Sequence, residues 1–541
     1  MRHSPPAPLL MSLVIGVDGG TEGLRAGVYR CSDGAELGYA SAPYATTYPH
    51  PSWAEQAPDD WWAALGAAVR GALRAAAAAH GGDPVASVAA LCCDTTCCSV
   101  VALDAAGRPL RPCLLWMDVR AAEQAAQLTR CGDGALRING GGAGPVSAEW
   151  MVPKAMWLKQ RERATYNAAA MVCEYQDYLN LRLTGRYVAS ACNASVRWHW
   201  RCGREPPASL LAAVGMEDLA AKWPREALPP GALVGGLTGD AALHLGLREG
   251  LPVAQGGADA FVGVLGLGVL HAGELALLTG SSHLHLGVAA QVQHGPGVWG
   301  AYEGALPFPA GGCILEGGQT STGSVAAWCR RLFSGPEAAL VPYATLDAEA
   351  AAVPIGCEGL LCLDHFQGNR TPHTDPLSRG AFAGLTLRHT RGHVFRAALE
   401  GVAFGTRAVL EAMRARGYQP TRITMAGGAA RSALWARITA DVVGLPLMLT
   451  RCGEAPALGC AVLAAVAAGV HTDVEAACAA MVHSERVIEP DAAAHAAYSR
   501  FYDAYAQLYP ALAPVVRAAG AAAAELDDFQ PRPSPLGSST V

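Results

Sequence analysis

The stretch LVIGVDGGT at residues 13–21 is followed almost directly by LRAGVY at residues 24–29. Two apolar runs joined by a glycine-rich turn predict a β-hairpin. Gly19 and Gly20 let backbone N–H groups approach an anion, and the carboxylate of Asp18 can hold Mg²⁺ or its waters. The turn has the chemistry of a phosphate-binding loop, although an ordinary hairpin turn would carry the same residues. It is neither a dinucleotide fingerprint nor a Walker loop, because GxGxxG and Gly-Lys-Ser/Thr are both absent.

The order of elements after this hairpin predicts a mixed α/β layer. Residues 36–44 alternate small and apolar side chains as a third strand would. An Ala-rich helix is predicted over residues 61–80, with Asp59 and Asp60 at its start. Residues 85–93 then return to a strand, and three strands, a helix and a further strand are typical of an α/β domain.

The second half of the chain restarts this plan. Residues 251–268 are again strand-like, and GELALLTGSS at residues 273–282 repeats an apolar strand followed by a turn of small residues. We therefore place a domain boundary near residue 270. The length of 541 residues also favours two large domains.

Two further turns could bind phosphate. The residues Thr-Gly-Ser-Ser at 279–282 follow a strand as the first turn does, and two facing lobes need such a pair of turns to enclose a triphosphate. Gly427 and Gly428 precede a helix predicted to begin at Ser432, and they allow a flat ring or a phosphate close to the backbone. For the second of these turns, a helix start without a ligand is the alternative.

Asp259 is the candidate for proton transfer. It lies in the sequence GGADAF at residues 256–261, where an unpaired carboxylate would be costly, so it either has a polar partner or lines a cleft. A kinase needs a carboxylate that accepts the proton of the attacking hydroxyl. A helix-capping aspartate is the alternative.

Composition and charge argue against several classes of function. The formal net charge of -6, from 40 Lys+Arg and 46 Asp+Glu, leaves no basic stripe for a nucleic-acid backbone. The sequence shows no signal peptide, and its 17 cysteines do not have the spacing of a disulfide framework. Both observations predict reduced thiols and a cytoplasmic protein. The cysteines at residues 92–98 continue an apolar run, which favours buried thiols over a zinc site. No apolar run has the length and continuity of a membrane span.

Taken together and in order, these motifs resemble the FGGY family of carbohydrate kinases over residues 12–510. Residues 16–26 resemble that family's first phosphate loop, and LWMDVRA at residues 115–121 resembles its sugar-facing segment. Gly257-Ala258-Asp259 resembles the segment of the catalytic base. The second phosphate loop, the adenosine loop and the closing glycine-containing helix start are matched at residues 279–282, 427–432 and 457–461.

The resemblance implies an α/β fold of two actin-like (ribonuclease-H-like) domains flanking a central cleft. Residues 12–270 would form the N-terminal, sugar-binding domain and residues 271–510 the C-terminal, ATP-binding domain. Residues 511–541 are Ala-rich and then rich in Pro, Gly and Ser, which predicts a disordered tail.

The resemblance also implies roles for individual residues. Asp259 would be the catalytic base, and Asp18 would hold Mg²⁺. The partners would be ATP, a small sugar and, as one option, a second copy of the chain in a homodimer. The residues expected to bind ATP or its phosphates are Gly20, Thr21, Arg25, Thr279, Gly280, Ser281, Gly427, Gly428 and Ser432, and those expected to bind the sugar are Trp116, Asp118, Arg197 and Glu316.

Within the family, residues 147–154 and 367–372 resemble ribulokinases more than xylulokinases. Trp-Met-Asp at residues 116–118 resembles the xylulose and D-ribulose enzymes, whereas Arg197 stands where ribulokinases tend to carry Lys. We expect phosphorylation of a terminal hydroxyl of a pentulose, first D-ribulose, with D-xylulose, L-ribulose or a polyol such as ribitol as alternatives. An actin-like ATPase and an inactive sugar sensor are the alternatives of another class.

Overall fold

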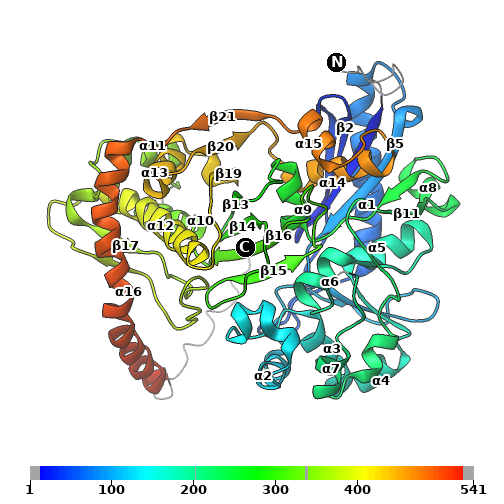
Figure 1. Ribbon diagram of the computed structural model, residues 1–541, viewed down its shortest axis with the longest axis horizontal. Helices are drawn as coiled ribbons and strands as arrows, with labels where there is room; N and C mark the ends of the chain where they lie inside the picture. The colour runs from blue at the N-terminus through cyan, green and yellow to red at the C-terminus, as the bar shows by residue number, and fades with distance from the viewer. Residues whose placement is uncertain (1–11, 202, 335–338, 528–541) are drawn as a thin grey trace, which may run out of the picture.

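The computed structural model describes residues 12–201, 203–334 and 339–527 (Figure 1). Each half of the chain forms a large mixed sheet. The N-terminal sheet has the order β11-β12-β5-β1-β2-β3, and the C-terminal sheet has the order β15-β16-β14-β13-β19-β20-β21. The strands of these sheets are β1 (Leu13–Gly19), β2 (Gly23–Arg30), β3 (Glu36–Pro43), β5 (Val88–Thr95), β11 (Leu233–Gly236), β12 (Pro252–Ala254), β13 (Glu274–Thr279), β14 (His283–Ala289), β15 (Trp299–Glu303), β16 (Cys313–Gln319), β19 (Arg422–Gly427), β20 (Leu447–Thr450) and β21 (Ser484–Ile488).

Helices cover both sheets, and the described residues form three smaller sheets as well. The helices are α1 (Pro58–His80), α2 (Ala122–Arg130), α3 (Met151–Arg161), α4 (Arg163–Ala168), α5 (Tyr175–Thr184), α6 (Ala191–Arg197), α7 (Ala208–Ala213), α8 (Gly239–Leu245), α9 (Asp259–Gly266), α10 (Gly323–Ser334), α11 (Tyr343–Ala351), α12 (Arg391–Arg414), α13 (Ala433–Val443), α14 (Ala455–Ala467), α15 (Val474–Met481) and α16 (Ala492–Asp527). The smaller sheets consist of β4 (Glu55–Gln56), β7 (Cys113–Leu114), β6 (Val100–Leu103) and β8 (Met171–Glu174), of β9 (Ala189–Ser190) and β10 (Ala227–Leu228), and of β17 (Leu361–Leu363) and β18 (Ala381–Ala383).

The two large sheets share one strand plan. β1 pairs antiparallel with β2 and parallel with β5, and β13 pairs in the same way with β14 and β19. In each half a long helix, α1 or α12, precedes the parallel strand. The predicted restart of the plan in the second half is therefore confirmed.

Alternating side chains of the first strand in each half face two different cores. Leu13, Ile15 and Val17 pack with α1, whereas Val14 enters a second core with α9 and α14. Strand residue Ala276 of β13 enters this same second core. Because successive strand residues point to opposite faces, each sheet contributes one face to a core shared by the two halves.

Helix α14 lies inside this shared core, although it comes late in the chain (Figure 1). A Cβ at Gly459 would lie 2.2 Å from the carbonyl oxygen of Val262 in α9, and a Cβ at Gly16 would lie 1.9 Å from that of Ala457. These glycines let α14 pack directly on α9 and β1. The glycine-containing helix start seen in the sequence is thus a packing contact between the halves.

Two expectations need correction. Residues 251–268 were predicted to be strand-like, but only β12 is a strand there, and the helix α9 follows. Residues 261–266 of α9 are all buried, and the periodicity of such a continuous apolar run does not distinguish a buried helix from a buried strand. Residues 511–541 were predicted to be disordered, but α16 continues to Asp527. Its alanines favour helix, and Tyr502 and Tyr505 bury against the C-terminal domain. Residues 528–541 lie outside the described residues. In the part of the chain that the structure describes, no helix has the length and hydrophobicity to cross a membrane.

Candidate active site

The turn between β1 and β2 sets a carboxylate against an arginine. Asp18 lies opposite Arg25 in the antiparallel register, and Arg25 Nη1 donates to Asp18 Oδ2 at 2.7 Å. Burial raises the pKa of Asp18, and the charge of Arg25 opposes this increase. Asp18 Oδ1 is buried and has no hydrogen-bond partner among the described residues. A buried carboxylate oxygen without a partner fits a hard cation such as Mg²⁺ or one of its waters.

Side chains from three other segments hold this turn in place. Trp116 Nε1 donates to Thr21 Oγ1 at 2.9 Å, and Gln56 Nε2 donates to the Thr21 carbonyl at 2.7 Å. The Tyr44 hydroxyl donates to the Gly20 carbonyl. The structure therefore places Trp116 beside the turn, where it orients Thr21, and the backbone of the turn is preorganised.

A second carboxylate, which the sequence analysis missed, lies beside Asp18. β5 runs parallel to β1, and Asp94 is the register partner of Asp18. Asp94 is fully buried, and burial, followed by the nearby Cys460 thiol and the charge of Asp18, raises its pKa well above the usual range. A signal was present, because two neighbouring predicted strands each end in an aspartate and the carboxyl ends of parallel strands meet at one edge of a sheet.

Asp259 is the first residue of α9 and lies next to the end of β5. Thr95 N donates to the Gly257 carbonyl at 3.1 Å, which ties the start of α9 to that strand. Ala260 N donates to Asp259 Oδ1 at 2.7 Å. Burial, followed by the charge of Asp18, raises the pKa of Asp259 to about 7. Such a carboxylate is suited to accept a proton near neutral pH.

The turns after β13 and β19 are bonded to each other. Thr279 Oγ1 donates to the Ala426 carbonyl at 2.6 Å and accepts from Ala429 N at 3.1 Å. Gly428 N donates to the Thr279 carbonyl at 3.0 Å. Gly427 has a φ of 97°, and a Cβ there would lie 1.9 Å from the Thr279 carbonyl oxygen, so glycine is required.

The tips of these two turns are exposed. Gly280 and Ser281 are accessible, as is Gly428. Ser432 has a structural role, because its Oγ accepts from Trp435 N at 3.1 Å and so caps α13. The expected contacts of these residues with ATP stay predictions.

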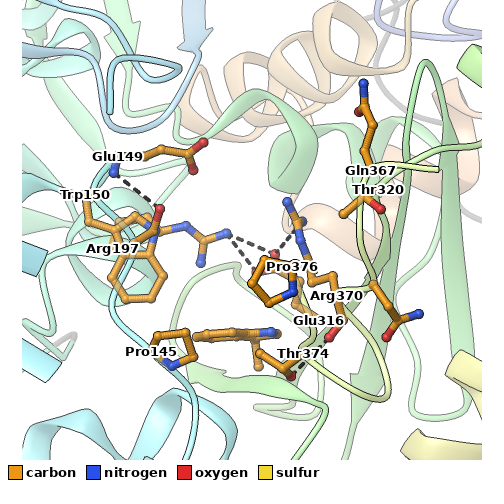
Figure 2. Close-up of a pocket in the computed structure, with 13 residues that line it drawn as sticks. Pro145, Glu149, Trp150, Arg197, Glu316, Thr320, Gln367, Arg370, Thr374 and Pro376 are labelled. Atoms are coloured by element: carbon orange, nitrogen blue, oxygen red, sulfur yellow. Dashed lines mark hydrogen bonds and ion pairs between the residues drawn. The ribbon is translucent and has the colours of Figure 1, made fainter. Parts of the chain in front are cut away.

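Arg197 and Glu316 meet across the two halves of the chain. Arg197 ends α6, and its Nη2 donates to both carboxylate oxygens of Glu316 in β16, at 3.0 and 2.9 Å (Figure 2). Its Nη1 donates to the hydroxyl of Tyr302 at 2.8 Å. The guanidinium carbon lies 5.3 Å from the centre of the Trp150 ring. One guanidinium nitrogen thus bonds both carboxylate oxygens while the other bonds Tyr302, which fixes the geometry of these side chains.

The Arg197–Glu316 pair lines a cavity of about 360 Å³ (Figure 2). Polar side chains from both halves share its wall with aromatic rings, which suits a small ligand rich in hydroxyl groups. The segment at residues 367–376 contributes much of the C-terminal wall. The sequence did not predict that this segment lines the cavity, because a local sequence pattern does not show which distant residues a loop contacts. The polar wall includes Ser147, Glu149, Thr320, Gln367, Asn369 and Arg370.

Like Trp116, Asp118 does not line this cavity, and the expected contacts of both with the sugar stay predictions. Its side chain is fully buried, and Arg120 donates to both of its oxygens, at 2.9 and 2.6 Å. Ala54 N donates to Asp118 Oδ2 at 2.7 Å. Buried Lys154 holds the same segment by donating to the Leu115 carbonyl at 2.6 Å. Asp118 and Lys154 thus shape the segment that carries Trp116.

Comparison with known proteins decides the family. Residues 13–266 match the N-terminal domain of the FGGY family of carbohydrate kinases, and residues 275–468 match its C-terminal domain. The chain belongs to this family. FGGY kinases phosphorylate sugars with ATP, so the protein is a sugar kinase.

Three relatives of this FGGY kinase each cover more than nine-tenths of its length. The human FGGY carbohydrate kinase domain-containing protein is 30% identical over 91% of this chain and 95% of its own. A ribulokinase from Shouchella clausii is 31% identical over 92% of this chain and 94% of its own. The crystal structure of xylulose kinase from Rhodospirillum rubrum superposes with a TM-score of 0.83 and 31% identity, over 93% of this chain and 100% of that one.

The predicted fold class is confirmed by these comparisons. The structural neighbours are FGGY sugar kinases with a two-domain, actin-like fold, and the two large sheets described above form the mixed α/β cores. Both ribulokinases and xylulose kinases are among the relatives of this FGGY kinase.

Proposed function

We propose that this FGGY kinase transfers the γ-phosphoryl group of ATP to a terminal hydroxyl of a pentulose, with D-ribulose as the leading substrate. The observation that carries the proposal is Asp259, whose pKa of about 7 results from burial and from the charge of Asp18. Attack of a hydroxyl on a γ-phosphate requires a base of this kind next to a group that manages phosphate charge.

Helix α6 connects the proposed base with the cavity. A Cβ at Gly257, two residues before Asp259, would lie 2.8 Å from Cys192 Cβ near the start of α6. Arg197 ends this helix and lines the cavity. Five residues of helix span about 7.5 Å. A five-carbon sugar held by the Arg197–Glu316 pair is of the right length to point its far hydroxyl toward Asp259.

The chain's own groups account for the remaining steps. Asp259 takes the hydroxyl proton as the new P–O bond forms and the bond to ADP breaks. The backbone of Gly20 and Gly280 and the hydroxyl of Ser281 bind phosphate oxygens, and Gly427 leaves room for the adenosine. Asp18 would hold Mg²⁺, which supplies charge neutralisation on the phosphates when bound.

The choice of D-ribulose rests on residues around the cavity and on the segment of Trp116. Residues 147–154 and 367–372, which resemble ribulokinases, contribute to the cavity wall. Residues 116–118 resemble the xylulose and D-ribulose enzymes instead. D-Ribulose satisfies both resemblances. D-Xylulose, L-ribulose and ribitol are the alternatives within the same reaction.

Coupled ADP release tests the proposal directly. The full chain is assayed with ATP and with D-ribulose, L-ribulose, D-xylulose, ribitol and glycerol in turn, each against a blank without sugar. We expect the largest stimulation with D-ribulose. A larger kcat/KM for another pentulose would replace the substrate and keep the reaction. ADP release that ignores every sugar would refute the proposal and favour an ATPase.

A further inference from the structure

Helix α16 reaches the wall of the cavity from outside the matched domains. The C-terminal family match ends at residue 468, and α16 spans Ala492–Asp527. In Figure 1 it runs along the outer side of the C-terminal half, and Pro510 and Pro514 lie within it. Tyr509, in the middle of α16, and Arg517, beyond the two prolines, contact residues 373–375, which are part of the 367–376 segment.

Asp375 receives both of these contacts. The Tyr509 hydroxyl donates to Asp375 Oδ2 at 2.9 Å, and Arg517 Nη2 donates to the same oxygen at 2.6 Å. The Asp375 side chain is 8% exposed and that of Arg517 is 51% exposed. The Tyr509 ring also stacks on His373, with ring centres 3.9 Å apart. A buried carboxylate is thus neutralised by an arginine that comes from the surface.

Asp375 in turn fixes the residues that line the cavity. Its backbone pairs with that of Asn369 in both directions, with N–O distances of 2.8 and 2.9 Å. Gly368 has a φ of 80°, and a Cβ there would lie 2.9 Å from Pro376 Cα, so the two arms of the segment touch. Asn369 and Thr374, next to these contacts, line the cavity with Arg370 and Pro376.

The same helix is also linked, through Asp364, to the strand that carries Glu316. The Tyr505 hydroxyl donates to Asp364 Oδ1 at 2.6 Å, and Gln319 Nε2 donates to Asp364 Oδ2 at 2.8 Å. Gln319 ends β16, three residues after Glu316. α16 therefore supports the cavity wall at two places, one through a buried polar chain and one through Asp375.

We propose that Arg517 and Tyr509 are positioning residues for the sugar: by holding Asp375 they keep the 367–376 segment in the shape that binds substrate. This role rests on the proposed function, which assigns the cavity to the sugar. Arg517 and Tyr509 act through Asp375, so they affect the sugar and leave ATP binding unchanged. Both residues lie outside the matched domains along the chain, so α16 would support the substrate site from a segment that the family match does not include.

The test uses the full chain with Arg517→Ala, Tyr509→Phe and Arg517→Lys. Arg500→Ala is the matched control, because Arg500 is an exposed arginine in the first part of the same helix. KM for sugar, KM for ATP, kcat and the melting temperature are measured for each variant. Hydrogen exchange of residues 365–378 is measured without any ligand.

For Arg517→Ala we expect KM for sugar to rise about tenfold, with KM for ATP within about twofold of wild type. Exchange at residues 365–378 should become faster. Tyr509→Phe, which deletes one hydroxyl and keeps the ring, should shift both quantities in the same direction by less. Arg517→Lys should recover part of the effect because the charge remains. Arg500→Ala should match wild type.

Two results would overturn the proposal. One is an Arg517→Ala variant with unchanged exchange and an unchanged KM for sugar. The other is an equal rise in KM for sugar and KM for ATP together with a lower melting temperature. That result would mean that the contact only stabilises the fold. If wild type phosphorylates no sugar, the proposed function fails, and the exchange at residues 365–378 still decides whether α16 holds the segment.

Discussion

The two halves of the molecule build the same turn and give it different chemistry. In the N-terminal half Asp18 lies opposite Asp94, one residue before the strands end, and in the C-terminal half Thr279 lies opposite Gly427 at the last residues of the strands. The N-terminal strands therefore end beside two carboxylates, whereas the C-terminal strands end in a hydroxyl and a glycine. The shared strand plan fixes where the turns lie, and the side chains decide what each turn can do.

The polar groups of the two turns are also satisfied differently. Thr279 Oγ1 both donates and accepts within the C-terminal half. Asp18 keeps one buried oxygen without a partner among the described residues, and burial raises the pKa of both Asp18 and Asp94. Buried polar groups that are left unpaired cost stability, and they recur where a protein binds ligands or moves protons. We therefore expect metal binding at the N-terminal turn, proton transfer at Asp259 in α9, and contacts of uncharged groups with phosphate at the C-terminal turns.

The largest expected effect is on kcat and comes from a substitution in the N-terminal half. Asp259→Asn keeps the shape of the side chain and removes its ability to accept a proton. We expect sugar-dependent kcat to fall by about 10³-fold, with the affinity for ATP unchanged. Steady-state kinetics and ATP titration measure the two quantities.

Asp240→Asn is the control for that substitution, because Asp240 is an exposed aspartate in the first turn of α8 in the same half. It should behave as wild type. Turnover by Asp259→Asn within about tenfold of wild type would remove Asp259 from the role of base.

The second prediction breaks the C-terminal side. Gly427→Ala forces a Cβ against the Thr279 carbonyl in a backbone conformation that suits glycine, whereas a Cβ at Gly428 meets nothing within 4 Å. We expect Gly427→Ala to lower the free energy of unfolding by about 2 kcal/mol and Gly428→Ala to change it by less than about 0.5 kcal/mol. Denaturant unfolding without ligand measures both, and equal losses would contradict the strained geometry.

The sequence predicted the parts of this comparison that depend on local pattern. Both hairpins and their turns follow from apolar runs interrupted by Gly, Asp and Thr, and Asp18 and Thr279 stand where the pattern places them. Packing between distant segments was beyond that pattern. Gly459 lets α14 pack in the shared core, Arg120 forms an ion pair with Asp118, and Tyr509 of α16 donates to Asp375. The contacts of Gly459 and Tyr509 depend on partners that are remote in sequence.

The third prediction concerns the contact between the two halves, where Arg197 meets Glu316. Arg197→Lys keeps the charge and loses the fork that bonds both carboxylate oxygens and Tyr302. We expect KM for sugar to rise about fivefold while KM for ATP stays at the wild-type value. Arg201→Lys, at an exposed position shortly after α6, is the control. A change in KM for ATP alone would move this pair from the sugar to the nucleotide.

The smallest effect is a dependence on pH that only the N-terminal half should produce. Asp259 must be ionised to act as a base, and its pKa of about 7 means that kcat/KM should fall about threefold from pH 7.5 to pH 6.5. Thr279, at the matching turn, cannot titrate in this range, so KM for ATP should stay flat. The raised pKa also affects stability, because the folded state holds this proton more tightly than the unfolded state. Protonation of Asp259 therefore makes its full contribution to the free energy of unfolding below the ordinary pKa of 3.8, and this contribution is lost as the pH rises to about 7. Asp259→Asn should therefore raise the melting temperature more at pH 8 than at pH 5, and an equal shift at both would mean that Asp259 titrates far from 7.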